Sequence, residues 1–482
     1  MFSYKLRQAK TALALFFFTH RRKILTITAS IVLVVLLVVY VIPPAVSAAG
    51  RHLDQRRVIN RFNNLSNEDF LYDFEYLMNA LEDNWPFFNL SVSANGVDVR
   101  ALADNIRAIL QGPEIGDAFE FHDLLQENFI APINQLGNLQ IVPDYMHYIM
   151  YTNLYRFARS PWFTCRWTDY LYEHYYRPGV VMFYTMMREA RGQTPLPEFD
   201  FGPVLEVSIL EEGKTGMIRV NQMINVWADP SVPLQLMRHY EAILYEFHGD
   251  IEGFEHLIID LRGNPAHHIM HNSVLLHFDT FVMTPLLHEP MALPGIVFYL
   301  DGEHSRVARE AFDTSYFGMA DVSHYNQPAH IGEPLPYLDT HINFHHSYEP
   351  FYVLGIEYEF AWGMDIFAFS LRDEVLFDGK VWLLTDGDTA SKAEAATAAL
   401  KYSNFATVVG DATRGIMEIT YVPDHAYLSL PNTGILLSFN IAYYTDMYGR
   451  PLQGFGIIPH YPNRPGMDAL ETVLAMIAEV PR

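Results

Sequence analysis

One serine, Ser391, lies at the junction between a predicted strand and a predicted helix. The run 380–385 (KVWLLT) is apolar and predicts a buried strand, a polar turn follows at 386–389, and alanines predict a helix over 393–400. Backbone N–H groups at the start of a helix have no partner inside it and point outwards. A serine there can attack a carbonyl carbon while the N–H of Lys392 stabilises the oxyanion that forms.

The same position also has an explanation without chemistry, because serine is a favoured residue at helix N-caps. A serine hydroxyl is, moreover, a weak nucleophile near neutral pH and needs a general base. The elements around Ser391 and the candidate bases elsewhere in the chain must therefore decide between the two interpretations.

Predicted strands and helices alternate in the C-terminal half, which favours an α/β core. Residues 256–261 (HLIIDL) predict a second buried strand, and 405–409 predict a third. Residues 204–210 and 216–220 predict two strands joined by a polar turn, and 234–247 predict a helix.

The region after residue 60 has helical patterns instead. Ser66 is a candidate N-cap with acidic residues behind it, the apolar spacing over 70–81 is helical, and Pro86 ends the segment. Two more helices are predicted over 97–110 and 118–130. These patterns indicate a small helical N-terminal unit.

The chain therefore divides into four predicted segments. They are a cytoplasmic leader with a membrane anchor (1–50), the helical unit (51–143), a connector or small subdomain of uncertain form (144–203), and an α/β catalytic domain (204–482) with an insertion near 280–350.

The predicted anchor is the uncharged run 24–42, about 28 Å long as a helix and close to the hydrocarbon thickness of a bilayer. Three basic residues, 21–23, precede it, so the positive-inside rule places the C-terminal bulk outside the cytoplasm. A cleaved signal peptide is the alternative, since Val46-Ser47-Ala48 resembles a cleavage site. We favour a retained single-pass anchor, and both interpretations predict an extracytoplasmic body.

Charge and cysteine content exclude several classes of function. Residues 51–482 hold 26 basic and 56 acidic residues, which argues against nucleic-acid binding, because phosphate contacts need clustered Lys and Arg. Cys165 is the single cysteine, so neither an intrachain disulfide nor a cysteine-based metal site is possible. We expect no cofactor, and the sequence does not predict the oligomeric state.

Several segments, in order along the chain, have the pattern of known motifs. Thr389-Ala390-Ser391 with Glu394 has the pattern T-A-S-x-x-E, and Val409-Gly410 with Thr413 and Gly415 has the pattern V-G-x-x-T-x-G. The flanking segments 258–265 and 454–459 have the patterns D-L-R-x-N-P and G-x-G-I-x-P, and a strand is predicted at 213–221. Together these segments resemble the C-terminal processing, or tail-specific, serine peptidases, a family with tricorn-core relatives.

This resemblance implies a crotonase-like spiral core of α/β type with Ser391 as the nucleophile that forms an acyl-enzyme. It also implies a peptide or protein substrate, cleaved in unfolded or C-terminal segments. The resemblance spans roughly residues 60–470 and is strong from 204 onward.

The general base of neither family branch is found. The branch with a lysine 25 residues after the serine would place it at Ile416. The branch with a histidine in L-G-D-G-H-T has 136–141 (LGNLQI) here, without histidine, and its late glutamate corresponds to Gln453. The aspartate that usually follows the last proline is His460.

The oxyanion segment also departs from the family, because Ala266 and His267 follow Pro265 where two glycines are usual. The backbone N–H of Ala266 is a candidate oxyanion donor if the turn keeps its geometry. His267 or His268 is a candidate substitute base, because neutral imidazole is the usual base for serine. The alternative, which we favour, is that both are exposed turn histidines.

Two other functions stay open. A non-catalytic relative could keep the groove and bind peptides or cell-envelope material, which the missing bases favour. Histidines could also bind a metal, with His267 and His271 one helical turn apart and a further group at 341–346, but no H-E-x-x-H motif is present. We therefore predict no metal site.

Overall fold

The computed structural model describes most of the chain after residue 63. The residues it describes are 64–113, 115–157, 166–192, 203–223, 233–265, 282–283, 286, 291–293, 295–300, 302–311, 344–347, 352–354, 377–417, 425–446 and 450–479. Leu65–Arg482 forms one compact unit. The fold is a mixed α/β fold, as the alternation of strands and helices in the sequence predicts.

A six-stranded sheet forms the core, in the order β14-β10-β9-β4-β3-β2. Its strands are β2 (Leu205–Glu211), β3 (Thr215–Val220), β4 (His256–Asp260), β9 (Lys380–Thr385), β10 (Ala406–Gly410) and β14 (Tyr461–Pro462). All neighbours are parallel except the β2–β3 hairpin. The predicted hairpin and the three predicted buried strands are confirmed. The carboxyl ends of β4 and β9 therefore lie at the same edge, where open α/β sheets usually bind ligands.

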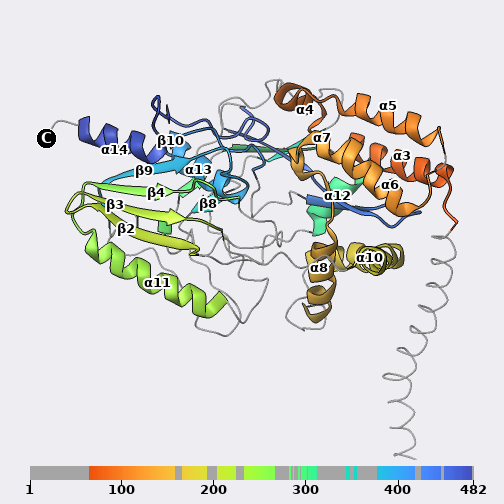
Figure 1. Cartoon of the computed structure of the whole chain (residues 1–482), viewed down its shortest axis with the longest axis horizontal. Coiled ribbons are helices and arrows are strands. Elements are labelled where there is room, and N and C mark those ends of the chain that lie inside the picture. The colour runs from red at the N-terminus through yellow and green to blue at the C-terminus, as the bar shows by residue number, and fades with distance from the viewer. Residues whose placement is uncertain are drawn as a thin grey trace, which may run out of the picture. The chain divides into compact units, whose positions relative to one another are not determined.

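Helices cover both faces of this sheet (Figure 1). The C-terminal helix α14 (Ala469–Glu479) packs on Ile258, Trp382 and Val409. Helix α11 (Pro233–Asp250), predicted over 234–247, lies on the opposite face, where Phe247 and Ile251 pack against Gly216. Helix α13 (Lys392–Tyr402) connects β9 to β10, and its residues from Lys392 to Leu400 are all buried. Its run of alanines suits this, because a helix that is apolar on most of its sides can be buried among other elements.

The predicted N-terminal helices are confirmed. They are α3 (Asn67–Asn84), α5 (Val99–Leu110) and α6 (Ala118–Leu125), which a π-helical turn (Gln126–Ile130) continues. The structure adds α4 (Phe88–Asn95) and the short α7 (Ala131–Ile133) and η3 (Leu136–Asn138), which the sequence does not predict. Ser66 caps α3 in a capping box with Asp69, as its position before an acidic first turn predicts.

The segment 144–203, whose form the sequence leaves uncertain, contains three helices. These are α8 (Asp144–Phe157), α9 (Arg166–Tyr175) and α10 (Pro178–Arg191). Aromatic stacking joins them: the His147 ring lies 4.1 Å from Tyr184 and 5.8 Å from Tyr175 between ring centroids. Tyrosines and histidines occupy these core positions, which weakens the apolar periodicity that would otherwise reveal a helix.

Smaller sheets connect distant parts of the chain. In one, β12 (Leu436–Asn440) lies between β1 (Gln140–Ile141) and β11 (His425–Ser429) and pairs with both. In another, β6 (Gly295–Leu300) lies between β13 (Ala442–Asp446) and β7 (Phe344–Ser347). A two-stranded sheet pairs β5 (Met291–Leu293) with β8 (Tyr352–Leu354), and the helix α12 (Glu303–Ala311) follows β6. Strand β6 therefore joins the predicted insertion to the C-terminal strand β13.

The predicted membrane span, 24–42, lies outside the described residues. Within residues 64–479, so far as the structure describes them, no helix has the length and apolar character needed to cross a bilayer.

Candidate active site

Ser391 occupies the predicted junction between β9 and α13. It is the N-cap residue of α13, with φ 54° and ψ −116°, and it is fully buried. Three other N-cap residues accept hydrogen bonds from the first turn of their helix through their side chains, and all three have the ordinary extended backbone instead (Ser66, Asp98 and Asp117). A serine at positive φ is strained, by about 1–3 kcal/mol, and such strain concentrates at functional sites.

Glu394, one turn into α13, holds this strained backbone in place. Its carboxylate accepts hydrogen bonds from the Ser391 N–H (2.9 Å), the Ile416 N–H (2.9 Å), the Gly415 N–H (2.6 Å) and the Thr413 hydroxyl (2.7 Å). Burial raises the pKa of Glu394 to about 7, although the four hydrogen bonds lower it. In the sequence Glu394 is recognised only as the last residue of the T-A-S-x-x-E segment, so this role in positioning comes from the structure.

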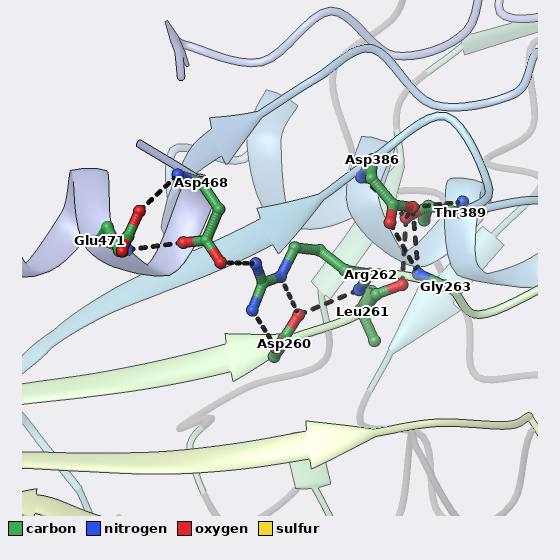
Figure 2. A network of polar contacts seen from close by, with 8 residues as sticks. All are labelled: Asp260, Leu261, Arg262, Gly263, Asp386, Thr389, Asp468 and Glu471. Carbon is green, nitrogen blue, oxygen red and sulfur yellow. Dashed lines mark hydrogen bonds and ion pairs between the residues drawn. The ribbon is translucent and has the colours of Figure 1, made fainter. Parts of the chain in front are cut away.

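The turns that follow β4 and β9 are bound to each other (Figure 2). The Asp386 carboxylate accepts from the Gly263 N–H (3.0 Å to each oxygen) and from the Thr389 N–H (3.0 Å). The Thr389 hydroxyl donates to the Leu261 carbonyl, and the Ala390 N–H donates to the Asn264 carbonyl at 3.0 Å. The segment that should border the nucleophile therefore does so as far as Asn264.

Arg262 connects this turn to the C-terminal helix (Figure 2). Its guanidinium binds the buried Asp260 (2.8 Å) and Asp468 (3.0 Å), the residue before α14. Asp468 also accepts from the Glu471 N–H at 2.8 Å, and hydrogen bonds from the Glu471 backbone and from Arg262 lower its pKa. Hydrogen bonding to Asp260 raises the pKa of Arg262.

The two glycine-containing motifs lie against each other. The Gly454 N–H donates to the Gly415 carbonyl (2.7 Å), and the Ile457 N–H donates to the Thr413 hydroxyl (2.7 Å). Gly456, at φ 69°, leaves so little room that a Cβ would lie 1.9 Å from the Thr413 carbonyl oxygen. The segments 413–415 and 454–457 therefore pack directly against each other, next to Glu394.

The residues at the positions where family members would carry a base have other roles in this structure. The N–H groups of Ile416 and Ser391 donate to the same oxygen of Glu394, so Ile416 lies beside the serine. Gln453 is buried, accepts from the Tyr444 N–H (3.2 Å) and donates to the Met417 carbonyl.

Two further residues at family positions make contacts in the sheets. Gln140, at the histidine position of the L-G-D-G-H-T pattern, is in β1 and pairs with Ser438 of β12. His460 accepts from the Val408 N–H at 3.0 Å through its ring and donates to the Val408 carbonyl through its backbone. Burial lowers the pKa of His460. These contacts explain the two residues without chemistry.

Other predicted site residues divide between described and undescribed parts of the chain. Lys392 is the first residue of α13 and is largely buried, with its N–H at the helix start as expected. Ala266, His267 and His268 lie outside the described residues, so their predicted roles stay predictions. Among the residues that the structure describes, no cluster of His, Cys, Asp or Glu is arranged to hold a metal ion.

Sequence reasoning missed the roles of Asp386 and Glu394. A signal existed for Asp386, because an aspartate three residues before a threonine in a polar turn is typical of a side chain that accepts from the following N–H groups. For Glu394 the S-x-x-E spacing is a capping-box signal for the bond from the Ser391 N–H, but no local signal existed for its other three donors, which come from residues 413–416.

Comparison with known proteins supports the family resemblance. The model of peptidase family S41 matches residues 333–462, which include the nucleophile segment. This match confirms the resemblance to C-terminal processing peptidases, suggests a serine protease and implies peptide or protein substrates. No curated protein matches the sequence.

Solved structures with a similar arrangement are distant. A candidate peptidase from Parabacteroides merdae shares 15% identity over 86% of this chain and 96% of that one, with a TM-score of 0.45. Mature CPAF in complex with lactacystin shares 18% identity over 52% and 47% of the two chains (TM-score 0.33). The photosystem II D1 C-terminal processing protease shares 13% over 57% and 53% (TM-score 0.28).

Proposed function

We propose that this chain is a serine endopeptidase in which Ser391 attacks a peptide carbonyl and forms an acyl-enzyme. The observation that carries the proposal is the backbone of Ser391, at φ 54° and ψ −116° between a buried strand and a buried helix. An ordinary N-cap serine does not need this conformation, whereas a strained strand-to-helix turn is a known way to aim a nucleophile.

The oxyanion of the tetrahedral intermediate would be stabilised by backbone donors. The Lys392 N–H, at the first position of α13, is one, and the Ala266 N–H is the second donor that the sequence predicts. Ser391 is fully buried in this conformation, so a substrate carbonyl reaches it only after neighbouring atoms move. His267 or His268 would take the hydroxyl proton.

A fluorophosphonate probe tests this proposal on the full-length protein. We expect wild-type protein to be labelled between pH 5 and 9 and Ser391→Ala to remain unlabelled, because only an activated serine reacts with the probe. Separate replacement of His267 and His268 by alanine then tests the base, and loss of labelling in one variant identifies it. If both variants are labelled as fast as the wild type, neither histidine is the base.

A binding protein on an inactive peptidase scaffold is the second candidate. The observation that favours it is Ile416 beside Ser391, where a lysine would be needed for a serine–lysine pair. In this case the wild type should not react with the probe, while it should still bind extended peptides. Labelling of a folded Ile416→Lys variant, with an unlabelled wild type, would support an intact nucleophile without its base.

We also propose that the protein is held in the cell membrane by residues 24–42, with the body outside the cytoplasm. The uncharged run behind three basic residues supports this. Full-length protein should stay in membranes during alkaline extraction, and protease added to intact cells should degrade the body. Release by alkali without a change in mass would contradict the anchor, and a mature chain that lacks about 48 residues would support the cleaved signal peptide.

A further inference from the structure

The carboxylate of Asp386 joins two turns that come from distant parts of the chain (Figure 2). It lies directly after β9, five residues before Ser391, and accepts from the Asp388 and Thr389 N–H groups at 3.0 Å each. These local contacts are those of an ordinary aspartate turn and involve one of its oxygens, Oδ1.

The contact with Gly263 is of a different kind. Its N–H donates to both oxygens of Asp386 at 3.0 Å, and it comes from the turn after β4, 123 positions away in the sequence. A hydrogen bond to an ionised carboxylate is about twice as strong as a neutral one. Asp386 therefore fixes the distance between the two turns as well as the shape of its own.

The position of the turn after β4 affects Ser391 through the neighbouring residue Ala390. The turn after β4 continues to Asn264, whose carbonyl accepts the Ala390 N–H at 3.0 Å and whose side chain donates to the Val220 carbonyl of β3. Ala390 immediately precedes Ser391. A displacement of Gly263 would therefore move the residue that carries the nucleophile.

We propose that Asp386 is a positioning residue for Ser391, acting through the Gly263 N–H and the Asn264 carbonyl on the Ala390 N–H. This inference rests on the proposed function, because it assigns the geometry of the same serine. Asp386 touches no reacting atom. A misplacement of about 1 Å at a reacting group can lower a rate by about 10²-fold, so a shifted turn should be visible in the chemistry.

The test compares Asp386→Asn with Asp388→Asn in the full-length protein. Both variants remove one acidic group from the same turn, but Asp388 is exposed and, among the described residues, its carboxylate makes no hydrogen bond to the turn that contains Gly263. We measure the rate constant of fluorophosphonate labelling and, by mass spectrometry, amide hydrogen exchange in peptides that contain Gly263 and Ala390.

We expect Asp386→Asn to lower the labelling rate constant at least tenfold and to accelerate exchange at both Gly263 and Ala390, while Asp388→Asn stays within twofold of wild type. Unchanged labelling in Asp386→Asn with faster exchange would overturn positioning and leave a structural role alone. Unchanged exchange at Gly263 and Ala390 in Asp386→Asn would show that Asp386 does not hold the two turns together. If the wild type is not labelled, the proposed function fails, and exchange at Ala390 still decides whether Asp386 holds the turn.

Discussion

The pH dependence of stability should report the state of Glu394, and the variant that isolates it is Glu394→Gln. The folded-state pKa is raised from 4.5 to about 7 by burial. A raised pKa means that the folded protein holds the proton more tightly than the unfolded chain, so this stabilisation is present below pH 4.5 and is lost as the pH rises through about 7. Between pH 5 and pH 8 the carboxyl group should contribute about 2.5 kcal/mol to this loss.

Other buried groups change the total in the opposite direction. Burial lowers the pKa of His147 and His174 to about 3 each, so neutral histidines destabilise the fold as the pH falls below 6.5 and the unfolded chain gains protons. The wild-type profile alone therefore mixes effects of both signs. The difference between the wild type and Glu394→Gln removes the histidines, which are present in both proteins.

Urea unfolding at pH 5 and pH 8 measures this difference directly. We expect the free energy of unfolding of the wild type, relative to Glu394→Gln, to be about 2.5 kcal/mol larger at pH 5 than at pH 8. A relative stability that is equal at the two pH values, or larger at pH 8, would refute the reasoning. It would mean that the four donors outweigh burial and keep Glu394 ionised throughout.

Two further predictions concern the backbone around the site. Gly456→Ala should destabilise the protein by more than Gly466→Ala in urea unfolding. Both glycines have positive φ, but only at Gly456 would a Cβ collide with backbone, at 1.9 Å. We expect Gly466→Ala to lower the free energy of unfolding by about 1–2 kcal/mol, and equal losses in the two variants would contradict the packing of the two motifs. Ser391→Gly should be more stable than Ser391→Ala by about 1–2 kcal/mol in the same assay, since glycine relieves the strain at φ 54°, and a more stable Ser391→Ala would show that the serine is not strained.

The sequence predicts the core sheet well, because each buried strand is a short apolar run that ends in a polar turn. The run 256–261 and the run 380–385 both become central strands, and Ser391 lies at the predicted junction. The helices at 144–191 were not predicted. In α8 and α9 the buried positions include His147, Tyr170 and Tyr175, whose polar groups obscure the apolar period. In α10 the buried residues do have helical spacing, so that helix could have been predicted (Val180, Phe183, Tyr184 and Met187).

The site was predictable only where the chemistry is local. A helix start, a cap and an acidic first turn can be seen within ten residues, so Ser391 and Lys392 could be named. The contact between Asp386 and Gly263 spans 123 positions, and Glu394 gathers donors from residues 413–416. Neither can be seen from spacing, because the pairing of strands β4, β9 and β10 brings these turns together.

The donors around Glu394 also limit where a general base can be. A carboxylate has about four positions for accepted hydrogen bonds, and Glu394 fills four with three N–H groups and one hydroxyl. These contacts occupy Glu394 in holding the backbone around Ser391, and Ile416, its neighbour on this side, has no basic group. The candidate bases that the sequence offers follow the turn after β4, whose chain continues from Pro265 to His267 and His268. If one of these histidines is the base, replacing both should abolish fluorophosphonate labelling, whereas a binding protein should be unlabelled before and after the replacement.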